Sequence, residues 1–113
     1  MHEMALTQGL IELIESEGRK RGFSRVRVVT LEVGALGGVD ADAMRFCFDA
    51  VARGAIVEGA RLDIRVVPGE GWCVDCAETV EMYERFGACP RCGRHHVHVA
   101  AGDEMLLKEL EVE

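Results

Sequence analysis

Several features that would assign the chain to a common class are missing from its 113 residues. No apolar run approaches the roughly 20 residues that a membrane-spanning helix needs, and the start lacks the basic segment and apolar stretch of a secretory signal. We therefore expect no membrane partner and a cytoplasmic location. The 13 basic residues are scattered rather than gathered in a stripe, and 20 acidic residues give a formal net charge of -7. Because phosphate binding draws on concentrated positive charge, nucleic acid is not expected as a partner.

The chain also lacks the marks of an enzyme and of a disulfide scaffold. No serine or cysteine has a recognisable base nearby in the sequence, so no catalytic residue is predicted. Five cysteines are an odd number, and in a reducing compartment they are better explained as metal ligands than as disulfides. Cys47 lies in an apolar helical stripe, and we interpret it as a small buried residue rather than a metal or redox site.

What is present predicts a small globular protein. Hydrophobic residues make up 49% and charged residues 29% of the chain, a balance typical of folded domains, and the length allows one domain or one domain plus a stapled subdomain. Helical spacing, valine-rich runs, alternation and turn residues predict a helix over 4–17 stopped by Gly18, a strand over 25–33, a helix over 41–53 capped by Asp40, and a strand over 61–67. The last stretch, 102–113, could hold a short helix over 105–110 or a strand, and we favour a strand over most of it.

The patterns also predict which side chains these elements bury. The first helix should bury Leu6, Leu10, Leu13 and Ile14, and the second Met44, Cys47, Phe48 and Val51. The phase change near Val28 and Val29 suggests that both faces of the first strand are partly covered. The strand over 61–67 alternates cleanly, which predicts one face formed by Leu62, Ile64 and Val66.

Two C-x-x-C motifs give the strongest chemical signal. Cys73 and Cys76 are separated by two residues, and Cys89 and Cys92 repeat that spacing twelve residues later. Two such turns can close a tetrahedron of sulfur ligands, which suits zinc. Four sulfurs leave no open position for water or substrate. The predicted Zn(II) site should therefore stabilise the fold of a separate small module over 69–98 rather than catalyse a reaction.

The opening residues Met-His-Glu are a second candidate metal site. The free amine, the backbone nitrogen and imidazole of His2, and the backbone nitrogen of Glu3 can converge on one ion. Square-planar nitrogen ligation favours Ni(II) or Cu(II) among divalent metals. The residues alone leave an alternative open, in which His2 is an idle solvated terminal residue and Glu3 stabilises the positive end of the first helix.

The opening MHEM, the knuckles GWCVDC and ACPRCG, and the closing GDEMLLKELEVE together resemble the HypA/HybF family of hydrogenase nickel incorporation proteins over essentially the whole chain. The resemblance implies an α+β fold in which two helices pack on a small three-stranded sheet. It implies a nickel-binding domain over 1–68, an inserted zinc-ribbon-like module over 69–98, and a return strand within 99–113 that completes the first domain.

The resemblance also implies a function. A member of this family is a metallochaperone, not an enzyme, that receives Ni(II) as cargo and, with the GTPase HypB, passes it to the large subunit of [NiFe] hydrogenase. The nickel site would fall on Met1, His2 and Glu3, with the His2 side chain as the irreplaceable ligand. The structural zinc site would fall on Cys73, Cys76, Cys89 and Cys92.

Three points stay open in the sequence. His95, His96 and His98 are candidate transient metal ligands during transfer, or simply a solvated surface. The return strand could pair within its own chain or be swapped with a neighbouring copy, and we expect a monomer or a weak homodimer. The rival function is a zinc-ribbon adaptor that binds proteins without transferring nickel.

Overall fold

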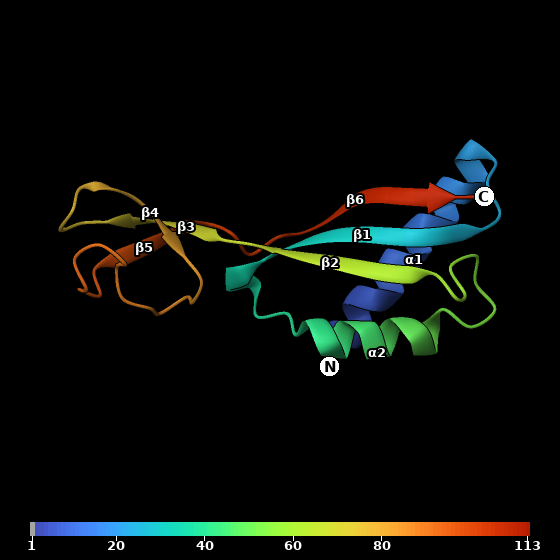
Figure 1. The fold of residues 1–113 in the computed structure, drawn as a ribbon, viewed down its shortest axis with the longest axis horizontal. Helices are drawn as coiled ribbons and strands as arrows, with labels where there is room; N and C mark the ends of the chain where they lie inside the picture. The colour runs from blue at the N-terminus through green and yellow to red at the C-terminus, as the bar shows by residue number, and fades with distance from the viewer. Residues whose placement is uncertain (1) are drawn as a thin grey trace. The chain divides into compact units, whose positions relative to one another are not determined.

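The computed structural model describes residues 2–113, and Figure 1 shows their arrangement as helices and strands. In chain order the elements are α1 His2–Arg21, β1 Val26–Gly34, the short 3-10 helix η1 Ala35–Gly37, α2 Ala41–Val51, β2 Arg61–Val67, β3 Gly69–Cys73, β4 Glu78–Met82, β5 Val97–Ala101 and β6 Met105–Val112.

The chain divides into two compact units. The first comprises Met1–Leu31, Val39–Ile64 and Leu107–Glu113, and the second comprises Glu32–Gly38 and Arg65–Leu106. The second unit therefore contains all of residues 69–98 and extends beyond them. The assignment of a nickel function to 1–68, completed by 99–113, stays a prediction.

Helix α1 is longer than the sequence pattern suggested, because Gly18 does not end it. Gly18 is buried inside the helix, where an added Cβ would lie 2.9 Å from the Phe23 carbonyl oxygen and 3.0 Å from Ile56 Cδ1. The helix ends at Arg21, and the next residue, Gly22, has a φ of 81° that suits a left-handed cap and an N–H that donates to the Gly18 carbonyl at 2.8 Å. Within residues 2–113, neither helix combines the length and apolar composition needed to cross a bilayer.

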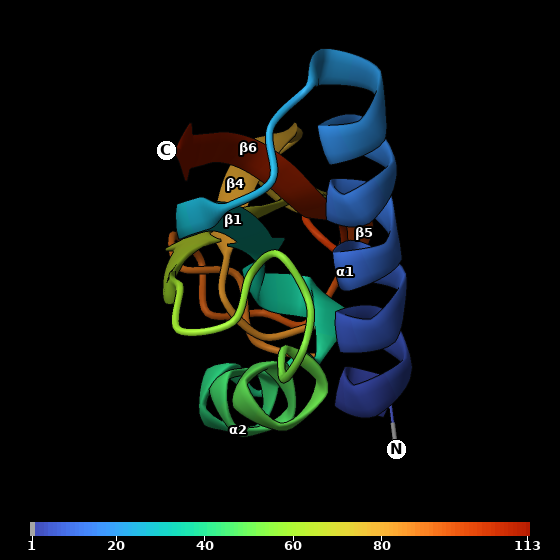
Figure 2. The same cartoon turned by 90° about the vertical axis from the view of Figure 1, so that its right-hand side faces the viewer.

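Helix α2 lies beside the N-terminal turns of α1 (Figure 2). Thr7 is fully buried between them: its hydroxyl donates to the Glu3 carbonyl at 2.7 Å and lies 3.6 Å from Met44 Sδ. The expected residues Leu10, Ile14, Met44, Cys47 and Phe48 are buried, whereas Leu13 is half exposed. Cys47 is thus a core residue, as predicted.

The first sheet has the strand order β2-β1-β6, so the C-terminal strand returns beside β1 as expected. Consecutive residues Val29, Thr30 and Leu31 are all buried, which confirms that both faces of β1 are partly covered. The bounds of β2 match the prediction. The predicted apolar face is only partly buried, because Leu62 is buried whereas Val66 is exposed.

The second sheet, of order β4-β3-β5, was not expected. Its inner face packs a small core formed by Leu36, Cys73, Val80, Met82 and Cys89, with Val97 and Val99 against it. The strand β3 carries two glycines because that face is crowded: a Cβ on Gly71 would lie 2.5 Å from both Met82 Sδ and Val97 Cγ1. Leu36 belongs to η1, far from residues 69–98 in the sequence. The residue pattern of 69–98 alone therefore could not show that this core includes Leu36.

Candidate metal centre

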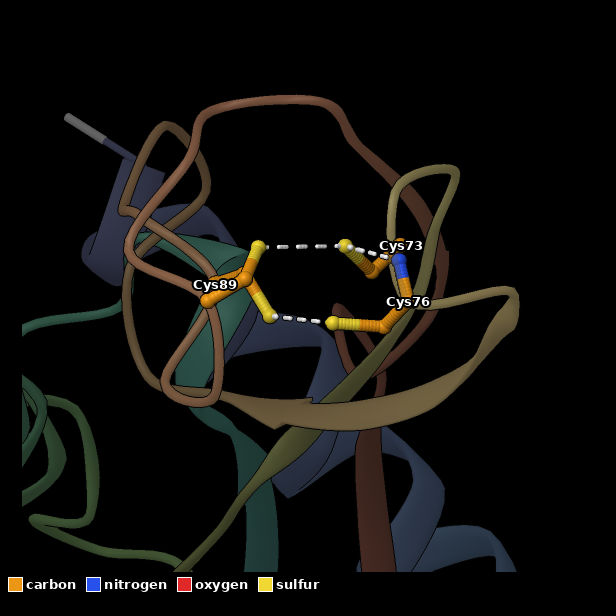
Figure 3. Close-up of side chains that lie close together, drawn as sticks. Cys73, Cys76 and Cys89 are labelled. Atoms are coloured by element: carbon orange, nitrogen blue, oxygen red, sulfur yellow. Dashed lines mark hydrogen bonds between the residues drawn. The ribbon is translucent and has the colours of Figure 1, made fainter.

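The second unit brings the four knuckle cysteines to one point. The Sγ atoms of Cys73, Cys76, Cys89 and Cys92 all lie within 4.8 Å of one another. In Figure 3 the sulfur of Cys76 faces that of Cys89, and the sulfur of Cys73 lies close by. Cys73 and Cys76 flank the turn after β3, and Cys89 and Cys92 belong to the loop between β4 and β5.

The sulfur spacing fits a tetrahedral ion. Sulfurs bound at about 2.3 Å from one zinc ion would lie about 3.8 Å apart. The Sγ atoms of Cys73 and Cys92 are 3.7 Å apart, and those of Cys76 and Cys89 are 3.9 Å apart. All five cysteines of the chain carry free thiols, so the four ligands are available to a metal.

Backbone N–H groups point at two of the sulfurs, as thiolates require. Cys76 N–H donates to Cys73 Sγ at 3.4 Å, and Arg91 N–H donates to Cys89 Sγ at the same distance. Backbone donation from Cys92 and Arg91 lowers the pKa of the Cys89 thiol to about 7. Burial raises the pKa of the Cys76 thiol to about 12, so a cation is needed to hold all four sulfurs as thiolates.

Both knuckles reverse the chain in the same way. The residue after the second cysteine has a positive φ in each case, 52° at Ala77 and 75° at Gly93. In the second knuckle, Gly93 N–H donates to the Cys89 carbonyl at 2.9 Å, and Cys89 N–H donates to the Arg94 carbonyl at 2.7 Å. These turns aim two sulfurs at one point, which is why the C-x-x-C spacing suits a metal.

Charged side chains join the two knuckles outside the sulfur cluster, and sequence reasoning missed them. Glu78 pairs with Arg91 at 2.6 Å, and Asp75 accepts from Arg94 at 3.4 Å. The only signal in the sequence was the sign of their charge, because the first knuckle contains Asp75 and is followed by Glu78, whereas the second contains Arg91 and is followed by Arg94. The pairs are partly exposed, so each adds little stability by itself.

The three histidines near the second knuckle lie outside the sulfur cluster. His96 Nδ1 lies 2.8 Å from Asp75 Oδ2, and His98 stands opposite Trp72 on the β3–β5 pair. His95 is exposed. Within the described part of the chain, the cysteines are the group of ligand atoms close enough together to share an ion.

The N-terminal candidate lies on the first turn of α1, where Met1 is outside the described residues. The His2 side chain is 58% exposed, and its Nδ1 lies 3.7 Å from Glu3 Oε2. The Glu3 carboxylate accepts from the Asp40 N–H at 3.3 Å. Donation from its own N–H and from Asp40 lowers the pKa of Glu3 below 4.5, so the carboxylate is charged at neutral pH.

Comparison with known proteins identifies the family of the chain. Residues 1–112 match the family model described as "Hydrogenase/urease nickel incorporation, metallochaperone, hypA". The chain belongs to the HypA family. It is 57% identical over 113 residues to the hydrogenase maturation factor HypA of Rhodopseudomonas palustris strain TIE-1 and 56% identical to that of Methylocella silvestris, covering the whole of each protein. A relative from Rhizobium leguminosarum bv. viciae is 48% identical over 112 residues, 99% of each chain.

Solved structures show the same fold for HypA proteins. The solution structure of the Ni metallochaperone HypA from Helicobacter pylori matches with a TM-score of 0.68 at 26% identity, covering 97% of this chain and 96% of that one. A second HypA solution structure matches with a TM-score of 0.70 at 26% identity, covering 100% and 97%. The resemblance stated from the sequence is therefore confirmed, as is the expectation of a metallochaperone family rather than an enzyme family.

Proposed function

We propose that this HypA-family chain binds Ni(II) as cargo at Met1, His2 and Glu3 and delivers it, with the GTPase HypB, to the large subunit of [NiFe] hydrogenase. The observation that carries the proposal is an accessible imidazole on residue 2, at the open end of a helix, in a chain of this family. The family description also names urease, so a second client is compatible with the same chemistry.

The helix start supplies suitable donor atoms. The first four N–H groups of a helix have no intrahelical acceptor, so the backbone nitrogens of His2 and Glu3 can be given up to a metal without breaking the helix. His2 Nδ1 can close a six-membered chelate ring with the nitrogen of its own residue. The terminal amine of Met1 would complete the set, giving the planar nitrogen ligation that Ni(II) and Cu(II) favour.

A planar site that uses the exposed His2 side chain suits transfer. Ligands of a partner can approach the ion from above or below the plane and displace the nitrogens one at a time. Amine, imidazole and backbone nitrogens must all lose protons to bind nickel, so affinity should fall as pH drops below neutral.

The four cysteines are proposed to hold structural Zn(II). The sulfur-only donor set selects zinc over the harder divalent ions, and a closed tetrahedron leaves no site for a substrate. When bound, zinc would supply folding energy to the second unit. His95, His96 and His98 remain candidates for transient nickel contacts, although His96 is already paired with Asp75.

We place the chain in the cytoplasm as a monomer or weak homodimer. Free thiols on all five cysteines suit a reducing compartment. The strand β6 pairs with β1 of its own chain, and the same strand could exchange between two copies.

A nickel titration of the zinc-loaded chain with unmodified Met1 tests the proposal. Calorimetry and visible absorption should show one nickel ion bound with micromolar or tighter affinity, and His2→Ala should abolish binding while zinc stays in place. His96→Ala is the matched control for a histidine elsewhere and should bind nickel as the parent does.

The other results have definite meanings. Equal binding by the parent and His2→Ala would move the nickel site away from the N-terminus and make the histidines after the second knuckle the next candidates. If neither protein binds nickel, the zinc-ribbon adaptor becomes the better account.

A further inference from the structure

The outer face of the second sheet is open to solvent. Along β3 the residues alternate, with Gly69, Gly71 and Cys73 turned to the core and Glu70 and Trp72 turned outward. On this outer face Trp72 stands opposite Thr79 of β4 and His98 of β5. Trp72 is the single tryptophan of the chain, yet 47% of it is exposed.

Two carboxylates of this face oppose each other directly. Glu70 and Glu81 are partners in the β3–β4 register, so their side chains project from the same side of the sheet. Like charges in that arrangement destabilise a sheet. Neither side chain has a hydrogen bond or ion pair with any residue of the 2–113 range, so nothing within this range offsets the repulsion.

The acidic surface continues past the end of β4. An open pocket of about 240 Å³ is lined by Glu81, Tyr83, Glu84 and Pro90, among others. Tyr83 is 62% exposed. The one basic residue of this turn, Arg85, is directed elsewhere, because its guanidinium donates to the Leu36 carbonyl at 3.3 Å and pairs with Asp103 at 3.6 Å.

We propose that these residues form a docking face for an arginine-bearing segment of a partner protein. The acidic–aromatic face comprises Glu70, Trp72, Glu81, Tyr83 and Glu84. A guanidinium can lie flat on an indole or phenol ring while its N–H groups pair with carboxylates. Trp72 lies diagonal to Glu81 across β3–β4, within reach of one such group.

The chemistry favours a guanidinium over a metal ion. The carboxylates are not among the groups of 2–113 whose ligand atoms are close enough to share an ion, and aromatic rings are poor metal ligands but good cation platforms. The face lies wholly within the second unit. The inference therefore does not depend on nickel binding at the N-terminus.

Tryptophan fluorescence of the metal-loaded full chain tests this inference, because Trp72 reports alone. The probe is a capped peptide, Gly-Arg-Leu-Arg-Gly, compared with the same peptide carrying glutamate in place of arginine. We expect a saturable change with the arginine peptide, weakened by added salt, and none with the glutamate peptide. Glu81→Gln and Glu70→Gln should each weaken binding about two- to five-fold.

Controls separate docking from folding. Glu58→Gln, a change of an exposed glutamate in the first unit, should bind the peptide as the parent does. Glu81→Gln should raise the melting temperature, because it removes a like-charge repulsion. If Glu81 instead stabilised the fold, the same substitution would lower the melting temperature. All variants should keep parental nickel binding.

Three results would overturn the inference. They are an absence of any saturable change with the arginine peptide, an equal response to the glutamate peptide, and emission that changes on dilution without peptide. The last would mean that a second copy of the chain covers this face.

Discussion

Glycine at position 34 is required by the approach of another backbone rather than by its own conformation. Its φ of -67° and ψ of 133° suit any residue, but an added Cβ would overlap the carbonyl group of Gly102. An added Cβ on Gly69 would overlap the Leu36 side chain, and an added Cβ on Gly102 would overlap the Cα atom of Gly69. Three glycines far apart in the sequence thus allow three backbone segments of the second unit to lie in contact.

Gly34→Ala should therefore destabilise the chain. Overpacking of this kind costs about 1–3 kcal/mol, and the obstacle here is backbone that cannot rotate away. Chemical denaturation of the zinc-loaded chain measures the effect. Gly9→Ala is the matched control, because nothing lies within 4 Å of its Cβ, and alanine inside a helix should raise stability by about 0.5–1 kcal/mol. Equal effects of the two substitutions would contradict the steric account.

Glu3 makes a pH-dependent contribution at the start of α1. Its pKa in the folded chain is lowered from 4.5 by its own N–H and by the Asp40 N–H, so the charged form favours folding. The stabilisation is fully present above the unfolded pKa and is lost as pH falls through the lower folded pKa. Compared with Glu3→Gln, the parent should melt higher at pH 6–7, and the difference should disappear well below pH 4. A difference that persists at that pH would rule out the carboxylate as its source.

At the level of elements, the stability of α2 depends on Asp40, the capping residue directly before the helix. Asp40 Oδ1 accepts from the N–H groups of Asp42 at 2.9 Å and Ala43 at 3.2 Å, satisfying two donors that the helix itself cannot pair. The Asp40 N–H in turn holds Glu3 at 3.3 Å. One residue thus caps α2 and contacts the first turn of α1.

Asp40→Ala should lower the free energy of unfolding by about 0.5–2 kcal/mol, since the cap acceptor is lost. Asp40→Asn keeps an oxygen acceptor and should recover most of that loss. Thermal unfolding followed by helical circular dichroism provides the measurement. Because the substitution leaves the backbone N–H in place, the contact with Glu3 should survive in both variants; equal losses would instead assign the effect to the charge.

For the whole molecule, the two units should respond differently to loss of zinc. The core beside the knuckles in the second unit is a cluster of five buried residues, two of them cysteine ligands, whereas the first unit buries its own aliphatic and aromatic side chains between α1, α2 and the sheet. Metal binding in small zinc modules supplies on the order of 10 kcal/mol. The second unit should therefore unfold without metal while the first remains folded.

Chelation of zinc, or Cys89→Ser, should remove the native amide signals of residues 69–98 and keep the helical circular dichroism of α1 and α2. Cys47→Ser is a control for cysteine loss outside the knuckles and should leave zinc binding intact. A Cys89→Ser protein with full zinc and native module signals would refute the four-sulfur site.

The sequence by itself determined the elements whose patterns are local. Helical spacing found α1 and α2, alternation found the bounds of β2, and the Asp40 cap followed from residue type. The knuckle spacing identified the four cysteines, because two thiols separated by two residues can face one ion from a tight turn. The motifs at both ends of the chain also indicated the family.

Tertiary structure decided what depends on distant neighbours. Position 18, inside α1, is occupied by glycine because Phe23 and Ile56 leave no room for a side chain, a tertiary contact that helix propensity cannot reveal. The second sheet was not predicted for two reasons. Its core includes Leu36 of η1, which is distant in the sequence, and its central strand contains glycines, which allow close packing but give no hydrophobic alternation. The opposed pair Glu70 and Glu81 likewise arises from strand register. Local preference is encoded residue by residue, whereas register and packing depend on which segments meet.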